Sequence, residues 1–142
     1  MIELIEELPD GVVGLVAVGE LSSDDYATVA NPAVERALER QDKLRLLHVL
    51  DDRFTGYTAG GMWDDAKLGL SHPCSWERIA VVTDHRQVRR LVKSAGWSVP
   101  GQMRLFSNAE RAEAEAWVSE GLEGERTTLR PFAPPGDRPG LA

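Results

Sequence analysis

Hydrophobic and polar residues follow a strand-like pattern at the start of this chain. Residues 2–8 place apolar positions among acidic ones, and residues 12–18 are apolar or glycine throughout. Pro9-Asp10-Gly11 lies between them and has the composition of a tight turn. The pattern therefore predicts an antiparallel hairpin at the edge of a sheet.

Three later segments are also short apolar runs bounded by polar residues. They cover residues 44–50, 78–83 and 103–106. Runs of this length and composition are typical of strands that are buried on both faces. Asp51-Asp52 closes the first run, which we expect to be the central strand of the sheet.

Between these runs the apolar residues recur at helical spacing. Helices are predicted after Ser22, from Thr58, after Asp84 and after Ser107, and the last two have the spacing of a capping box with Gln87 and Glu110. Pro32 falls inside the first helix. It predicts either a kink or a second helical segment that Asn31 caps.

The resulting element order is ββαβαβαβα. Strands that alternate with helices are most simply parallel, with right-handed crossovers. The sequence therefore predicts an α/β domain with a mixed five-stranded sheet and helices packed on it. We expect this domain to span residues 1–121, and the Pro/Gly-rich residues 122–142 to form a flexible tail.

Composition limits where the protein acts and what it binds. The chain has 142 residues and a formal charge of -7, which disfavours nucleic acid as a partner. Its single cysteine, Cys74, rules out an intramolecular disulfide. An acidic N-terminus and the lack of a long apolar run predict a cytoplasmic protein without a membrane span.

The loop at residues 51–61 is the first candidate for chemistry because ligands bind beyond the carboxyl ends of strands in open α/β sheets. Its glycines and the following helix could present backbone N–H groups to an anion. Alternatively, Thr58 only caps the helix and the glycines only turn the chain. The loop contains neither a P-loop nor a GxGxxG fingerprint.

Several charged or imidazole side chains have more than one interpretation. Asp64, Asp65 and Lys67 either form acid–base machinery or belong to a solvated helix face, and neighbouring helical residues point in different directions. His72 ends this helix, whereas His48 lies inside an apolar strand and is interpreted as a satisfied core histidine. No metal-ligand spacing is present, so neither a metal nor a cofactor is expected.

Aromatic residues allow two interpretations as well. Met62, Trp63 and Trp76 either line an apolar pocket, which Trp97 and Trp117 would extend, or pack in the core or at an interface.

The run at residues 57–72, Tyr-Thr-Ala-Gly-Gly-Met-Trp-Asp-Asp-Ala-Lys-Leu-Gly-Leu-Ser-His, resembles the SpoIIAA-like proteins of bacteria. Residues 78–84, Arg-Ile-Ala-Val-Val-Thr-Asp, extend the likeness, which covers about residues 1–120. This group is placed with the STAS and SEC14-type domains. The resemblance implies a mixed sheet packed against helices.

The resemblance also implies two kinds of activity. In regulatory STAS domains a serine or threonine at the start of the helix after a central strand is phosphorylated; Thr58 is the nearest positional match and Thr55 the second. The Asp-Ser-Ser/Thr-Gly signature of those proteins is missing here. The SEC14 side implies a small lipid or other apolar ligand, held in a shallow groove near Tyr57, Trp63 and His72.

The leading hypothesis is a non-enzymatic binding or regulatory module of the STAS/SEC14 type, which acts through the loop and helix at residues 51–72. The expected surface comprises Tyr57, Thr58, Trp63, Asp64, Asp65, Lys67 and His72. The alternative is a carrier of a small apolar or anionic ligand. A small enzyme that uses Asp64, Asp65 or His72 is the third hypothesis, and a homodimer is the expected oligomer.

Overall fold

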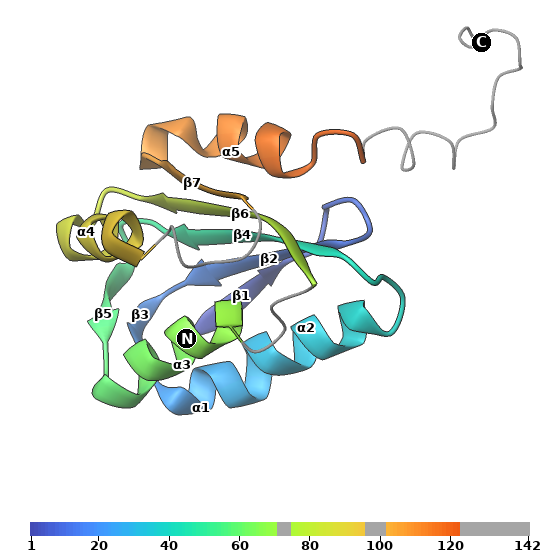
Figure 1. Cartoon of the computed structure of the whole chain (residues 1–142). Coiled ribbons are helices and arrows are strands. Elements are labelled where there is room, and N and C mark those ends of the chain that lie inside the picture. The colour runs from blue at the N-terminus through green and yellow to red at the C-terminus, as the bar shows by residue number, and fades with distance from the viewer. Residues whose placement is uncertain (71–74, 96–101, 123–142) are drawn as a thin grey trace, which may run out of the picture.

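The structure, a computed structural model, describes residues 1–70, 75–95 and 102–122 (Figure 1). Its centre is a five-stranded sheet with the order β1-β2-β4-β6-β7. The strands are β1 (Ile2–Ile5), β2 (Val12–Ala17), β4 (Leu44–Leu50), β6 (Trp76–Thr83) and β7 (Gln102–Phe106). Only β1 is antiparallel to its neighbour. The mixed five-stranded sheet and the central place of residues 44–50 are confirmed.

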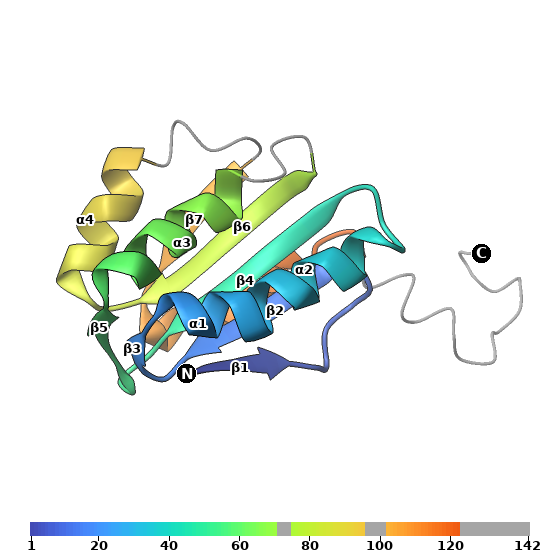
Figure 2. The ribbon, with the colours of Figure 1, turned by 90° about the horizontal axis from the view of Figure 1, so that it is seen from below.

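Helices cover the two faces of this sheet unequally. The helical elements are α1 (Ser23–Asp25), a π-helical turn η1 (Tyr26–Ala30), α2 (Asn31–Leu38), α3 (Ala59–Leu70), α4 (Arg86–Ala95), a 3-10 turn η3 (Asn108–Glu110) and α5 (Arg111–Val118). Figure 1 shows α5 on one face and α1, α2 and α3 on the other. Seen from below in Figure 2, α3 crosses the sheet and α4 lies beside it near β7. No helix in the described part of the chain is long and apolar enough to cross a membrane.

A second, two-stranded sheet was not expected from the sequence. It pairs β3 (Gly19–Leu21) with β5 (Phe54–Tyr57) in parallel. These strands are short, and Gly56 in β5 has a φ of 145°, a conformation that side-chain-bearing residues rarely adopt. Neither segment therefore shows a clear apolar alternation. The pairing holds the loop after β4 against the segment that leads into α1.

The helix around Pro32 does divide into two segments, but Asn31 does not cap the second. Asn31 has helical dihedral angles and donates its N–H to the carbonyl of Tyr26, five residues earlier. The helix is therefore continuous through a π-helical turn, and Pro32 follows where its missing N–H is tolerated. A capping residue lies at the start of a helix, whereas Asn31 follows the helical turn η1 directly.

The two predicted capping boxes had different outcomes. Ser107 and Glu110 form one as expected, at the start of η3. Helix α4, however, begins at Arg86, one residue later than a box on Asp84 and Gln87 requires. The Asp84 carboxylate instead accepts a hydrogen bond from the Asn108 N–H at 3.0 Å. The expected helix end at Gly96 and the expected tail lie outside the described residues.

Strand parity divides the core into two clusters. In β4, Leu44, Leu46 and Leu50 face the side of α1, α2 and α3, whereas Leu47 and Val49 face α5. Both faces of β4 are buried, which explains its nearly continuous apolar run. This parity places His48 on the face of the sheet that α3 covers.

Candidate functional site

A cluster of four polar side chains lies between the central strand and α3. Its members come from four elements: Tyr26 from η1, His48 from β4, Tyr57 from β5 and Asp65 from α3. The Tyr26 hydroxyl donates to Asp65 Oδ1 at 2.6 Å. His48 Nδ1 lies 3.6 Å from the same oxygen. We call these residues the Asp65 cluster.

The tyrosines of the cluster remain protonated. Burial, followed by the charge of Asp65, raises the pKa of Tyr26 far above its ordinary value. The pKa of Tyr57 is raised for the same two reasons. Both side chains are therefore neutral phenols near neutral pH, and the Tyr26 hydroxyl donates its proton to Asp65.

His48 is buried without full satisfaction of its ring. Its exposed fraction is 5%. Within the described structure, Nε2 has no hydrogen-bond partner. The expectation of a satisfied core histidine is therefore wrong for this nitrogen. Leaving a buried polar atom unpaired costs about 1–3 kcal/mol, so the fold tolerates a real penalty here.

A cavity of about 80 Å³ adjoins the cluster. His48, Tyr57 and Asp65 contribute its polar wall. The remaining described lining is apolar and comes from β4, β6, α4 and β7: Leu46, Leu50, Ile79, Val81, Val88, Val92 and Met103. A larger hollow of about 490 Å³ lies between the β1–β2 turn and α2, but it is a surface groove with charged side chains such as Arg36 and Arg40. Only the smaller of these two hollows adjoins the Asp65 cluster.

The start of α3 approaches the neighbouring backbone very closely. A Cβ atom at Gly61 would overlap the Leu21 carbonyl oxygen, and one at Gly60 would overlap the Ser23 hydroxyl. The Gly61 N–H donates to Thr58 Oγ1 at 2.9 Å. The glycines therefore allow close packing, and Thr58 caps the helix. This arrangement supports the capping interpretation of the loop rather than the anion site.

The residues expected to form one surface in fact point in different directions. Tyr57 and Asp65 face inward, as part of the Asp65 cluster. Trp63 is 66% exposed and is not among the described residues that line the cavity, so of its two interpretations the interface one fits better. The glycines Gly60 and Gly61 lie on the face of α3 that packs against Leu21 and Ser23.

The other predicted site residues have more ordinary surroundings. Asp64 Oδ1 pairs with Lys67 Nζ at 3.2 Å. Hydrogen bonding with Ser23 lowers the pKa of Asp64. Thr55 is exposed on β5. His72 lies outside the described residues. Asp64 and Asp65 therefore do point apart, as helical geometry predicts, and of the two only Asp65 lines the cavity.

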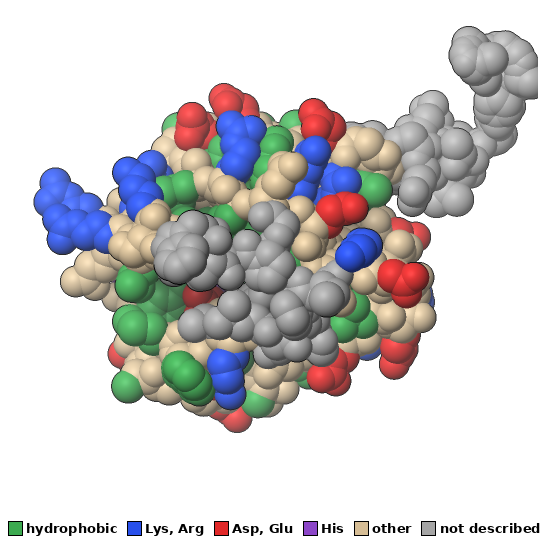
Figure 3. Space-filling view, in the orientation of Figure 1, with side chains coloured by type: hydrophobic (Ala, Val, Ile, Leu, Met, Phe, Trp, Pro, Cys, Tyr) green, Lys and Arg blue, Asp and Glu red, His purple; other side chains and the backbone are tan. Residues whose placement is uncertain are grey.

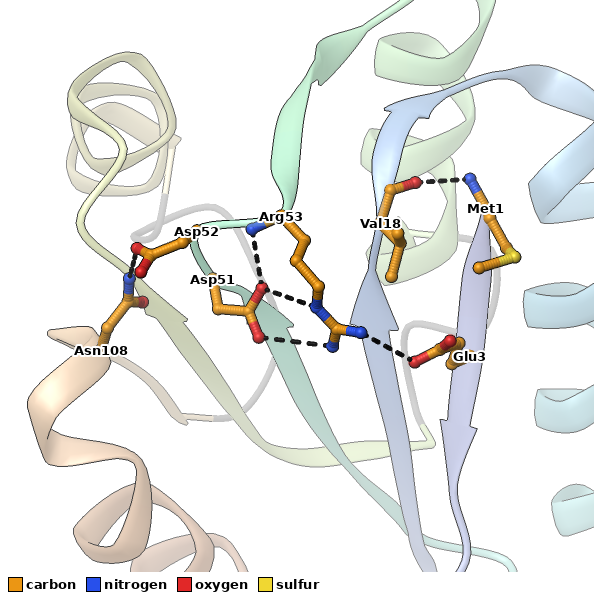
Figure 4. A network of polar contacts seen from close by, with 7 residues as sticks. All are labelled: Met1, Glu3, Val18, Asp51, Asp52, Arg53 and Asn108. Atoms are coloured by element: carbon orange, nitrogen blue, oxygen red, sulfur yellow. Dashed lines mark hydrogen bonds and ion pairs between the residues drawn. The ribbon is translucent and has the colours of Figure 1, made fainter.

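The acids that follow β4 form a structural network, shown in Figure 4. Partial burial raises the pKa of Asp51, but hydrogen bonds and charge attraction from Arg53 outweigh it and keep the pKa below its ordinary value. Arg53 also reaches Glu3 at 3.5 Å, and Asp52 accepts from Asn108 at 3.4 Å. This network links the edge strand β1 to the carboxyl ends of β4 and β7.

Sequence reasoning missed Tyr26 and His48 as members of a site. A signal was present for His48, which shares its strand parity with Leu44, Leu46 and Leu50. A lone imidazole on an apolar strand face marks a place where a polar partner must come from another element. The sequence gives no such signal for Tyr26, because tyrosine is ordinary at an apolar helix position.

Comparison with known proteins gives the family and the fold. The SpoIIAA-like family model matches residues 12–119. The chain belongs to the SpoIIAA-like family. A solved structure of an uncharacterized DUF3478-family protein from Shewanella loihica PV-4, described as having a SpoIIAA-like fold, is similar with 26% identity and a TM-score of 0.65. The match covers 83% of this chain and 92% of that chain. No curated protein matches the chain.

Proposed function

We propose that this SpoIIAA-like protein is a non-enzymatic binding module and that its ligand is a small, largely apolar molecule held between α3, α4 and the sheet. The observation that carries the proposal is the cavity of about 80 Å³, which has apolar walls and the Asp65 cluster at one side. Ligand sites typically combine an apolar lining with a few convergent polar groups.

The lining favours binding over catalysis. The cavity residues in the described part of the chain include an imidazole and a carboxylate but no serine, threonine, cysteine or lysine. Serine, threonine, cysteine and lysine are common nucleophiles of covalent catalysis, so a described lining without them favours binding. His48 and Asp65 on their own can orient a polar group of a ligand, which is a binding role.

Native mass spectrometry of the protein purified from its natural host tests the proposal. We expect a non-covalent mass that is released when the protein unfolds. Val92→Trp should remove this mass, because Val92 lines the cavity. Leu91→Trp is the matched control, because Leu91 is 47% exposed on the same helix. An absent adduct in the wild type, or one that both variants retain, would contradict the proposal.

The outer face of α3 favours a second candidate function, the binding of a protein partner. Trp63 is 66% exposed and Met62 is 48% exposed. Hydrophobic side chains gather on this side of the molecule, at the lower left of Figure 3 over α3 and β5. Exposed aromatic residues are common anchors of interfaces. A second copy of this chain is the simplest partner to test, by sedimentation of the wild type and Trp63→Ala across a range of concentrations.

Phosphorylation of Thr58 or Thr55 would regulate such an interface. A phosphate on Thr58 would esterify the oxygen that accepts the Gly61 N–H and would add negative charge and strong acceptor oxygens at the start of α3. Thr55 is exposed and needs no rearrangement to be modified. The same mass spectrum reports phosphate as a covalent addition. Fragmentation then distinguishes the two threonines.

A further inference from the structure

Nε2 of His48 is the polar atom of the cavity wall that lacks a hydrogen-bond partner among the described residues. His48 lines the cavity and is 5% exposed, yet Nε2 has no partner among the described residues. Buried polar atoms in proteins are almost always paired. Because the His48 side chain lines the cavity, its unpaired nitrogen points to a hydrogen bond that forms with a molecule other than the protein.

The second ring nitrogen decides which kind of hydrogen bond this is. His48 Nδ1 lies 3.6 Å from Asp65 Oδ1, on the side of a negative charge. A carboxylate beside one imidazole nitrogen favours the tautomer with the proton on that nitrogen. Nε2 then carries the lone pair. The ring accordingly offers the cavity a hydrogen-bond acceptor.

The charge of Asp65 disfavours an anion in the cavity. The Tyr26 hydroxyl is already engaged, because it donates to Asp65 at 2.6 Å. An anionic ligand would meet the negative charge of Asp65 at the polar wall of the cavity, and desolvating such an ion is costly. Of the two ligand types expected for a carrier, the apolar one fits and the anionic one does not.

We propose that the cavity is a binding site for small, neutral, mainly apolar molecules that carry a hydroxyl group, and that the hydroxyl donates to Nε2 of His48. This inference rests on the proposed binding function and specifies its ligand. The volume of about 80 Å³ holds the hydroxyl and a few adjoining carbon atoms. The rest of a ligand lies toward the half-buried side chains of Val92 and Met103.

Phenol, anisole and benzene are the probes that separate the polar contact from the apolar one. Phenol can donate a hydrogen bond, whereas anisole keeps the ring and the oxygen without the proton. Titration of the full-length, isotope-labelled protein is followed by NMR, through the methyl groups of Val88 and Met103 and through the ring nitrogens of His48. We expect phenol to bind about tenfold more tightly than anisole or benzene, which is the effect of one good hydrogen bond to a buried acceptor.

The variant His48→Phe keeps a ring at the site and removes the acceptor. We expect it to bind phenol and benzene equally. Equal binding of all three probes to the wild type would overturn the hydroxyl inference and leave the apolar site intact. If no probe binds at these methyl groups, the proposed binding function fails as well.

A measurement on the wild type alone guards against misfolding of the variant. Phenol should move the ¹⁵N resonance of Nε2 to lower frequency, as expected for a lone pair that accepts a hydrogen bond, and should move that of Nδ1 much less. An Nε2 resonance that stays constant while the methyl signals titrate would also overturn the hydroxyl inference. Such a result would mean that the ring of phenol binds without its hydroxyl reaching His48.

Discussion

The two faces of the central sheet are covered in opposite ways. On the α5 face, apolar side chains from β4, β6, β7 and α5 form a cluster, and arginines hold the end of the helix. On the α3 face, a helix that exposes Met62 and Trp63 places a carboxylate against a buried histidine beside a cavity. The first arrangement stabilises the fold. The second retains an energetic cost, which is typical of a site that has something to bind.

The attachment of α5 shows how complete the first arrangement is. Arg78 donates to the Trp117 carbonyl at 2.7 Å, and Arg45 donates to the carbonyls of Val118 and Glu120 at 3.1 and 2.6 Å. These guanidinium groups satisfy the free carbonyls of the helix end and complement its negative dipole. On the α3 face, Nε2 of His48 stays unsatisfied within the described residues and lies on a side chain that lines a cavity, whereas the unsatisfied Asn108 Oδ1 at the start of η3 adjoins no described cavity.

The largest difference between the faces should appear at their tryptophans. Trp117 lies between the guanidinium groups of Arg78 and Arg104, at 5.1 and 5.3 Å, and its ring is 6.0 Å from that of Phe106. We expect Trp117→Ala to lower the free energy of unfolding by about 3 kcal/mol. Trp63→Ala should change it by less than about 0.5 kcal/mol. Urea denaturation measures both, and similar losses would remove the contrast.

The next largest effect should come from Asp65. Asp65→Ala removes the acceptor of the Tyr26 hydroxyl and leaves that hydroxyl buried. We expect a loss of about 2 kcal/mol in the free energy of unfolding. The neighbouring change Asp64→Ala is the control and should cost much less, because its partners Ser23 and Lys67 are exposed and can bond with water instead. If the two variants were equally stable, Asp65 would have no special structural role.

His48→Phe should act in the opposite direction and stabilise the protein. It removes the unpaired Nε2 and extends an apolar ring toward the cavity, so we expect a gain of about 1 kcal/mol. Leu47→Phe, one residue away on the α5 face, should instead lose about 1–3 kcal/mol because that side has no space for a larger side chain. A destabilised His48→Phe variant would show that a bound water satisfies the imidazole.

The smallest effect concerns two capping boxes, Ser22 with Asp25 at the start of α1 and Ser107 with Glu110 at the start of η3. Partial burial raises the pKa of Asp25, but hydrogen bonds with Ser22 and the charge of the N-terminal amine outweigh it and keep the pKa below its ordinary value. Hydrogen bonding with Ser107 lowers the pKa of Glu110, which is fully exposed.

A carboxyl with a lowered folded-state pKa stabilises the protein above its unfolded-state pKa, near 4, and loses this contribution as the pH falls through the folded-state pKa. Thermal unfolding between pH 7 and pH 2 should therefore show a shallower acid decline for Asp25→Asn than for the wild type. Glu110→Gln should change the decline less, because solvent screens its interactions. A larger effect from Glu110 would reverse this ranking.

Local chemistry was enough to predict most of the fold. Residues 44–50 are apolar on both faces, which predicts a central strand. Ser107 and Glu110 form a capping box, so four consecutive residues are enough to predict a helix start there. The strands β3 and β5 escaped prediction because they stabilise one another across more than thirty residues of chain. Neither segment has a strong preference of its own.

The site depended on contacts that no local pattern encodes. The sequence by itself predicted the order of the elements, the central place of residues 44–50 and the fact that Asp64 and Asp65 point apart, and it offered the capping of α3 by Thr58 as one of two interpretations. Only the tertiary structure decided that Asp65 points inward, toward His48 and Tyr26, and that Trp63 points out. The physical reason lies in the packing of Gly60 and Gly61. These glycines let one face of α3 pack closely against the Leu21 carbonyl of β3 and the Ser23 side chain of α1, both of which are distant in sequence.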